Sequence, residues 1–122
     1  MTGSLMAIRM AESGLRARIR KYLGGFSNVY QFWPVQKGYG RRTVDLLACV
    51  DGAFFSVEVK DIGKAPTELQ YDVLCEVSQA KGSSFWCDSW ESFIGQFEVH
   101  CRERGLCLIP KKPPAIKGAS KS

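Results

Sequence analysis

Two apolar segments rich in β-branched and aromatic residues, Thr43–Val50 and Ala53–Lys60, are separated only by the dipeptide Asp51-Gly52. Every second residue is apolar from Val44 to Val50 and from Ala53 to Val59, which is the pattern of β-strands that bury one face. The sequence Asp-Gly favours a two-residue type I′ turn, because both central residues of that turn have positive φ angles. The pattern therefore predicts a β-hairpin with one apolar face directed at the core.

A two-residue turn places Val50 opposite Ala53 and, near the open end of the hairpin, Asp45 opposite Glu58. Cβ atoms of opposed residues lie about 4.5–5.5 Å apart, and two like charges at that distance destabilise a sheet. We therefore expect a positive charge beside the pair, either Lys60 or a divalent cation such as Mg²⁺, which binds one or two carboxylates together with waters and phosphate oxygens. Two alternatives remain open: a solvated acidic pair balanced by lysine, and a three-residue loop whose bulge would separate the carboxylates.

Other segments predict three helices and three further strands or edge strands around the hairpin. Their expected ranges are Leu5–Leu23 (helix), Asn28–Val35 (strand), Pro66–Lys81 (helix), Ser83–Cys87 (strand), a helix from an Asp88/Glu91 capping box to Gly105, and Leu106–Ile109 (edge strand). The last helix is expected to bury Trp90, Phe93, Ile94, Phe97 and Cys101. The hydrophobic spacing follows the helical period in each of the three helices.

The first helix carries an acidic residue, Glu12, in the same stripe as Ile8, Leu15 and Ile19. A carboxylate at the buried edge of a helix needs a partner, which makes Glu12 a candidate site residue. The alternative is a helix that begins near Ser13, where Glu12 is only a favourable charge at the N-terminus.

The helix expected at Pro66–Lys81 contains Gln70 at the edge of a stripe predicted to be buried, which consists of Leu69, Val73, Val77 and Ala80. The segment Thr67–Gln70 fits a capping box, in which the glutamine side chain bonds back to the start of the helix and has no chemical role.

Composition narrows the class of protein. A chain of 122 residues with 45% hydrophobic and 24% charged residues is expected to form one domain. We expect no membrane span and no signal peptide, because every apolar run is short.

The five cysteines are odd in number and lack Cys-X-X-Cys spacing, which predicts buried free thiols in a reducing cytosol and argues against zinc. The single histidine, His100, gives no support for a Ser-His or Cys-His catalytic pair.

The formal net charge of +5 is concentrated locally. Lysines of the segment 110–122, which is expected to be a disordered basic tail, account for most of it. Two further groups lie near the predicted site and are candidates for DNA phosphate contacts: Arg16 and Arg20 on the first helix, and Lys37, Arg41 and Arg42 before the aspartate strand. A solvated charged surface is the alternative for both groups.

Several segments occur in a particular order along the chain: Gly38-Tyr39-Gly40, Val44-Asp45-Leu46-Leu47, Asp51-Gly52-Ala53-Phe54-Phe55, Glu58-Val59-Lys60 and Pro66-Thr67-Glu68-Leu69-Gln70. In this order they resemble the VRR-NUC family, a branch of the PD-(D/E)XK nuclease superfamily, over roughly residues 12 to 95. Val44 stands where that family usually has proline, a departure that affects strand geometry and removes no metal ligand.

The resemblance implies a restriction-endonuclease-like α/β core, a central mixed sheet flanked by helices in the order α-β-β-β-α-β-α, within a single nuclease domain at 1–109. It implies that Mg²⁺ or Mn²⁺ is bound by Asp45, Glu58, the backbone carbonyl of Val59 and Glu12. Lys60 and Gln70 complete the implied catalytic set, with Lys60 orienting the attacking water and stabilising negative charge.

The function expected from this resemblance is a structure-specific DNA endonuclease, a Holliday (four-way) junction resolvase that acts as a homodimer in a bacterial or phage-infected cytoplasm. A less selective nickase or flap nuclease is the alternative enzyme. A non-catalytic DNA-binding module with the same fold is the alternative from another class. No organic cofactor is expected.

Overall fold

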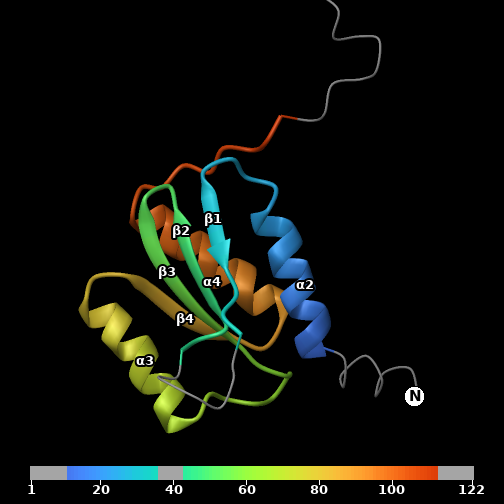
Figure 1. Ribbon diagram of the computed structural model, residues 1–122, viewed down its shortest axis with the longest axis vertical. Helices are drawn as coiled ribbons and strands as arrows, with labels where there is room; N and C mark the ends of the chain where they lie inside the picture. Colours follow the sequence, from blue (N-terminus) through green and yellow to red (C-terminus); the bar gives the residue numbers. More distant parts are fainter. Residues whose placement is uncertain (1–10, 36–42, 113–122) are drawn as a thin grey trace, which may run out of the picture.

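The computed structural model describes residues 11–35 and 43–112, which form an α/β arrangement of three helices and one four-stranded sheet. The elements, in chain order, are α2 (Ala11–Leu23), β1 (Val29–Phe32), β2 (Leu46–Val50), β3 (Ala53–Val59), α3 (Glu68–Gln79), β4 (Ser83–Cys87) and α4 (Trp90–Glu103) (Figure 1). The sheet order is β1-β2-β3-β4. The first two pairs are antiparallel and the pair of β3 with β4 is parallel, so the sheet is mixed.

The hairpin of β2 and β3 has the predicted turn and register. Asp51 and Gly52 have φ angles of 49° and 87°, as a type I′ turn requires. Val50 pairs with Ala53, and the ladder continues to the pair of Leu46 with Val57. The prediction of the register from the dipeptide alone is therefore confirmed.

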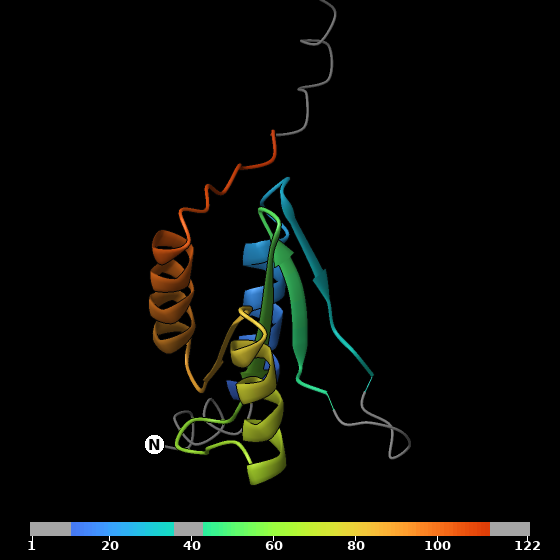
Figure 2. The same cartoon turned by 90° about the vertical axis from the view of Figure 1, so that its left-hand side faces the viewer.

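One face of the sheet packs against α2 and α4, and this layer contains the hydrophobic core. In Figure 2 α4 stands on one side of the sheet, away from β1 and β2. The buried residues of this layer include Leu15, Ile19 and Leu23 from α2, Leu46, Ala48, Val50, Phe55, Val57 and Val59 from the hairpin, and Phe93, Phe97 and Cys101 from α4. The aromatic residues of α4 thus lie in the core, as their helical spacing predicted.

The opposite face is covered by α3 over β3 and β4 only, and the predicted stripe of α3 is wrong in part. Leu69 is 59% exposed and Ala80 is exposed, whereas Leu74 is buried. Strand β4 determines which side of α3 faces the sheet, since Ser84 Oγ donates a hydrogen bond of 2.6 Å to the carbonyl of Leu74. Gly82 also allows a close approach, because a Cβ there would lie 2.8 Å from Val77 Cγ1.

Of two predictions at the ends of α4, the first is wrong and the second is confirmed. The N-cap is Ser89, whose hydroxyl accepts a hydrogen bond from the Ser92 amide, so no Asp88/Glu91 capping box forms. Asp88 instead accepts a 3.0 Å hydrogen bond from the Gly63 amide. Gly105, with a φ of 67°, follows the helix as predicted.

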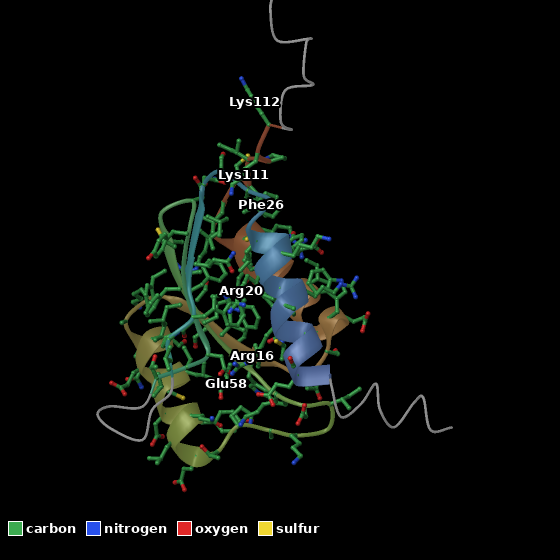
Figure 3. All side chains as sticks on the ribbon, turned by 45° about the vertical axis from the view of Figure 1, so that its right-hand side comes forward. Arg16, Arg20, Phe26, Glu58, Lys111 and Lys112 are labelled. Carbon is green, nitrogen blue, oxygen red and sulfur yellow. The ribbon has the colours of Figure 1, made fainter. Side chains whose placement is uncertain are left out.

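Residues 106–109 form no strand, contrary to the expected edge strand. This segment leaves α4 and runs beside the loop between α2 and β1, where Phe26 and Pro110 form a single antiparallel bridge. Figure 3 shows Phe26 and Lys111 at the same end of the molecule. A side-chain partner replaces the regular ladder here, since the Ile109 amide bonds to Asn28 Oδ1 at 2.9 Å.

The cysteine prediction holds in part. All five thiols are free, but only Cys87 and Cys101 are buried. Cys49, Cys75 and Cys107 are exposed, because they lie on the uncovered part of the sheet, on the solvent side of α3 and beyond α4. Among the described residues, no helix combines the length and the hydrophobicity that crossing a membrane requires.

Candidate active site

Asp45 and Glu58 lie together at the open end of the hairpin and are almost completely buried, with 7% and 3% of their surface exposed. Asp45 immediately precedes β2, one position beyond the last ladder pair of Leu46 with Val57. The register therefore brings the two carboxylates to opposed positions, as the sequence predicted. Burial of two acidic groups at this spacing is unfavourable unless other groups compensate their charge.

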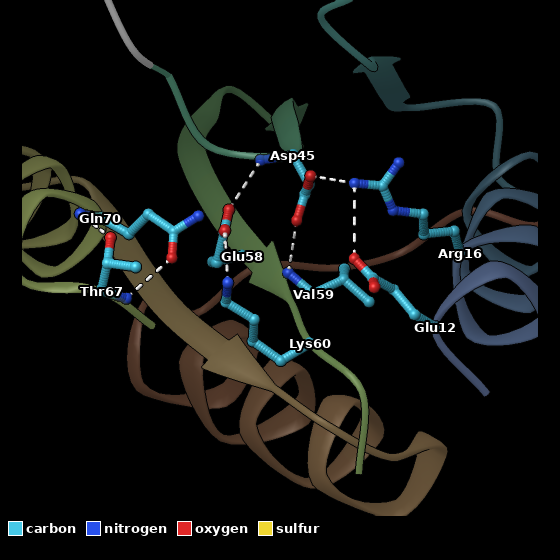
Figure 4. Close-up of polar contacts among 8 residues, drawn as sticks. All are labelled: Glu12, Arg16, Asp45, Glu58, Val59, Lys60, Thr67 and Gln70. Atoms are coloured by element: carbon cyan, nitrogen blue, oxygen red, sulfur yellow. Dashed lines mark hydrogen bonds and ion pairs between the residues drawn. The ribbon is translucent and has the colours of Figure 1, made fainter. Parts of the chain in front are cut away.

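Reciprocal hydrogen bonds between backbone and side chains fix this pair. The Asp45 amide donates to Glu58 Oε1 at 3.1 Å, and the Val59 amide donates to Asp45 Oδ2 at 2.9 Å (Figure 4). These bonds take the place of the next backbone pair of the ladder, which explains why β2 begins at Leu46 and not at the predicted Thr43. Side-chain oxygens thus satisfy backbone donors that would otherwise be buried without a partner.

Arg16 on α2 provides the positive charge nearest to Asp45. Its Nη2 donates a hydrogen bond to Asp45 Oδ1 and lies 3.9 Å from Glu12 Oε1, one helical turn away. The Nε of Arg16 is buried and makes no hydrogen bond within 11–35 and 43–112. The guanidinium group therefore stands between the Glu12 and Asp45 carboxylates and shields them from each other.

The start of α2 is held at the site by Asp61, which follows β3. Its Oδ1 accepts a 3.1 Å hydrogen bond from the Glu12 amide, one of the N-terminal amides that have no partner within a helix. Glu12, Ser13, Arg16 and Asp61 line a surface hollow of about 380 Å³. The site is therefore open to solvent on the α2 side, although its two central carboxylates are buried.

Lys60 lies on the other side of Glu58, with Nζ 3.8 Å from Oε2, which is an ion-pair distance without a hydrogen bond. Burial and the neighbouring charge of Asp45 raise the pKa of Glu58 from 4.5 to about 7, and Lys60 only partly opposes this effect. The protonated form of Glu58 is consequently favoured more than that of an ordinary glutamate. Arg16 and Lys60 thus oppose the charge of the pair, but burial and the proximity of Asp45 still disfavour the charged form of Glu58.

Gln70 forms the capping box that the sequence predicted. Its Oε1 accepts a 2.8 Å hydrogen bond from the Thr67 amide, and its own amide donates to Thr67 Oγ1. Figure 4 shows the side-chain nitrogen of Gln70 directed toward Glu58. The capping role leaves this nitrogen available, so a structural role and a position at the site are both compatible with the geometry.

The oxygens of Asp45 and Glu58 are suitable ligands for one hard divalent cation, which needs only one or two protein carboxylates besides waters and phosphate oxygens. The buried like charges provide the electrostatic reason for such binding, because a cation would remove their repulsion. No group of three or more His, Cys, Asp or Glu residues able to hold a metal occurs in the described part of the chain. Glu12 is separated from the pair by Arg16, and the described contact of Val59 is through its amide, so their predicted ligand roles stay predictions.

The predicted DNA-binding residues fall into two groups. Arg16 and Arg20 lie on α2, where Arg20 stacks over the ring of Trp33 with its guanidinium carbon 4.9 Å from the ring centroid. Lys37, Arg41 and Arg42 lie outside the described residues.

The sequence predicted Arg16 only as a DNA-binding residue and not as the partner of Asp45. It did not indicate that Asp61 holds the start of α2 at the site. The spacing of Glu12 and Arg16, four residues apart on a helix, was the available signal for an ion pair at this position. No local signal links Asp61 to α2, because that contact joins residues 49 positions apart. Searches against protein-family models, curated proteins and solved structures find no match for this chain.

Proposed function

We propose that this protein is a metal-dependent endonuclease that hydrolyses phosphodiester bonds in DNA. The observation that carries the proposal is the buried pair of Asp45 and Glu58 with Lys60 beside it. A purely structural role does not require two opposed carboxylates, since an apolar pair would stabilise the hairpin better. The mixed sheet with helices on both faces is compatible with the restriction-endonuclease-like core that the sequence resemblance implies.

In the proposed mechanism Asp45 and Glu58 hold Mg²⁺ or Mn²⁺. When bound, such a cation polarises the phosphoryl oxygens and lowers the pKa of a coordinated water. The fixed hydrogen bonds from the Asp45 and Val59 amides hold both carboxylates in place before substrate arrives. Preorganised charge of this kind is the largest common contribution to catalysis, because no reorganisation is needed during the reaction.

The cationic side chains have separate roles in this proposal. Lys60 faces the attacked phosphate, orients the attacking water and stabilises the negative charge that develops on the phosphoryl oxygens. Arg16 releases Asp45 Oδ1 and binds a neighbouring phosphate of the DNA strand. The Arg16 side chain is 39% exposed, so that its guanidinium group can reach a phosphate once it leaves Asp45. The side-chain nitrogen of Gln70 donates to a site oxygen while its carbonyl remains in the capping box.

We extend the proposal to substrate and assembly on the basis of the sequence resemblance. The expected substrate is branched DNA, a Holliday junction, and two copies of the chain acting as a homodimer supply the two symmetric cuts. A less selective nickase or flap nuclease would use the same site on other substrates.

A non-catalytic DNA-binding module is the second candidate, and one observation favours it. Arg16 already compensates Asp45 within the chain, which is what a site without a metal ion requires. In that case the carboxylates serve only to position Arg16 and Lys60 for phosphate contacts.

Cleavage assays on labelled DNA separate these functions. The substrates are a four-way junction, a nicked duplex and a linear duplex, each incubated with Mg²⁺, Mn²⁺ or EDTA. Asp45→Asn and Lys60→Gln are the test variants. Asp72→Asn and Lys64→Gln, at exposed positions on α3 and in the preceding loop, are the matched controls.

We expect metal-dependent cleavage of the junction that falls at least about a hundredfold in both test variants and stays unchanged in both controls. Cleavage of all three substrates would support the less selective nuclease. Binding of the junction without cleavage by any metal would exclude the enzyme and favour the binding module.

A further inference from the structure

Two stretches of the chain contain basic residues and no acidic residue. They are 13–44 and 104–122, so that all twelve Asp and Glu residues except Glu12 lie between Asp45 and Glu103. The first stretch includes all of α2 except its first two residues, and the second begins at the end of α4. The two stretches are far apart in sequence, and their relation depends entirely on the fold.

The fold brings the two stretches together directly after α2. The Lys111 amide donates to the carbonyl of Gly25 at 2.8 Å, and the Ser27 amide donates to the carbonyl of Ile109 at 2.7 Å. Phe26 and Pro110 form the bridge between these bonds. Lys111 therefore lies beside a residue only two positions beyond the end of α2.

Side-chain bonds hold the same segment at a second place. The Asn28 Nδ2 donates to the carbonyl of Cys107 at 2.7 Å, and its Oδ1 accepts from the Ile109 amide. The Cys107 amide donates to Asp51 Oδ2 in the hairpin turn at 3.0 Å. These contacts use backbone groups of the segment. The side chains of Lys111 and Lys112 are exposed and take part in none of these contacts.

A basic line results along one side of the molecule. Arg16 and Arg20 are four residues apart on one face of α2, and the next position on that face is Gly24, adjacent to the Gly25 that contacts Lys111. Figure 3 shows the line from Glu58 through Arg16 and Arg20 to Phe26, Lys111 and Lys112. From Arg16 to the end of α2 at Leu23 is seven residues, or about 10 Å along the helix axis, and Lys111 lies beyond that end, beside Gly25.

We infer that Lys111 and Lys112 form the distal end of a contact surface for the backbone of duplex DNA that begins at Arg16. The hydrogen bonds of the segment 107–111 to Gly25, Ser27, Asn28 and Asp51 hold the two lysines in place. This inference rests on the proposed function for the position of the DNA at the carboxylates. A separation of more than about 10 Å corresponds to at least about three base pairs at 3.4 Å each. The surface thus follows one duplex arm for several base pairs beyond the phosphate at Asp45 and Glu58.

Binding measurements without metal test the surface independently of cleavage. The probe is a fluorescent 20-base-pair linear duplex in EDTA, with Kd determined by anisotropy between 50 and 200 mM salt. The test protein is the double variant Lys111→Gln, Lys112→Gln. The matched control is the double variant Lys81→Gln, Arg102→Gln, which removes the same amount of positive charge. Lys81 is exposed in the turn before β4, and Arg102 is exposed on α4.

The test variant should weaken binding about tenfold at 100 mM salt and reduce the slope of log Kd against log salt by about 1.8, because two phosphate contacts are lost. The control should change neither value by more than about twofold. Equal effects of the two double variants would overturn the inference, since net charge alone would then explain them.

A second arm separates this inference from the proposed function. For the parent, Kd should rise sharply when the duplex is shortened below about eight base pairs, and the test variant should lose this length dependence. Loss of length dependence with no cleavage by any variant would keep the contact surface and reject the nuclease. Normal cleavage with identical length dependence in parent and test variant would keep the nuclease and reject the contact surface.

Discussion

Two polar clusters, each with buried groups at its centre, lie at opposite ends of β3 and β4, and they differ in whether like charges lie together. Near the hairpin turn, Ser83 is fully buried and its hydroxyl contacts His100 Nδ1 at 3.0 Å and Arg104 Nε at 2.5 Å. Arg104 also donates to the carbonyl of Lys81 at 2.7 Å. At the other end, Asp45 and Glu58 oppose each other with the same sign of charge.

The difference supports a stabilising role for the first cluster and the proposed catalytic role for the second. In the first cluster burial lowers the pKa of His100, so the imidazole is neutral and each group finds a partner. The second cluster contains a carboxyl whose pKa is raised to about 7 by burial and by Asp45. Each cluster contains buried polar groups, and the close pair of like charges distinguishes the candidate active site.

The largest expected effect on stability comes from Arg16→Met, which keeps the helix and the aliphatic chain of α2 but removes the charge beside Asp45. We expect the free energy of unfolding at pH 7.5 to fall by about 3 kcal/mol, because a buried carboxylate loses its partner. Urea unfolding measures this loss. A variant as stable as the parent would mean that the two clusters do not differ in the way described.

Glu58→Gln should have the next largest effect, in the opposite direction. A raised pKa means that the charged form is disfavoured in the folded state, so the cost is absent below the unfolded pKa of 4.5 and complete above about 7. The variant should therefore be more stable than the parent by about 2 kcal/mol at pH 8, with the gain vanishing at pH 4. Thermal unfolding across this range checks the pH dependence, and a gain that is constant with pH would contradict it.

Ser83→Ala should destabilise the protein by about 1.5 kcal/mol, because Arg104 Nε and His100 Nδ1 lose a buried partner. Cleavage or DNA binding by the folded variant should remain within about twofold of the parent. The comparison would be weakened if this variant lost activity as strongly as Asp45→Asn does.

The smallest effect is expected for His100→Gln. A lowered pKa means that the fold disfavours the charged imidazole, so the parent loses stability as pH falls below the unfolded pKa of 6.5. The variant should show a shallower loss between pH 6.5 and 5 than the parent, measured by urea unfolding. Glu103 and Arg104 face the imidazole with opposite effects on its pKa, so parallel curves for parent and variant would show that their charges outweigh burial.

Much of the hairpin could be predicted from sequence because its determinants are local. Asp51-Gly52 sets the turn, the turn sets the register, and the register brings Asp45 opposite Glu58. The capping box of Thr67 and Gln70 was predictable for the same reason. In each case a few consecutive residues contain the whole physical cause.

The errors concern contacts that consecutive residues do not determine. The exposed side of α3 depends on how Gly82 and Ser84 of the next strand meet the helix, so the stripe through Leu69 was wrong. The segment 106–109 resembled an edge strand, but Asn28 and Asp51 bind its backbone through side chains. The contact of Arg16 with Asp45 spans 29 positions and likewise follows only from the tertiary structure.

The Asp51 carboxylate, which binds the Cys107 amide, has a consequence for the order of folding. The two partners are 56 residues apart, and synthesis at about 5–20 residues per second separates them by about 3–11 s. A hairpin forms within about 1–10 μs. The turn must therefore specify its own register long before its distant partner exists, and the positive φ angles of Asp51 and Gly52 allow it to do so. Docking of the segment that carries Lys111 is then a late step on a preformed hairpin.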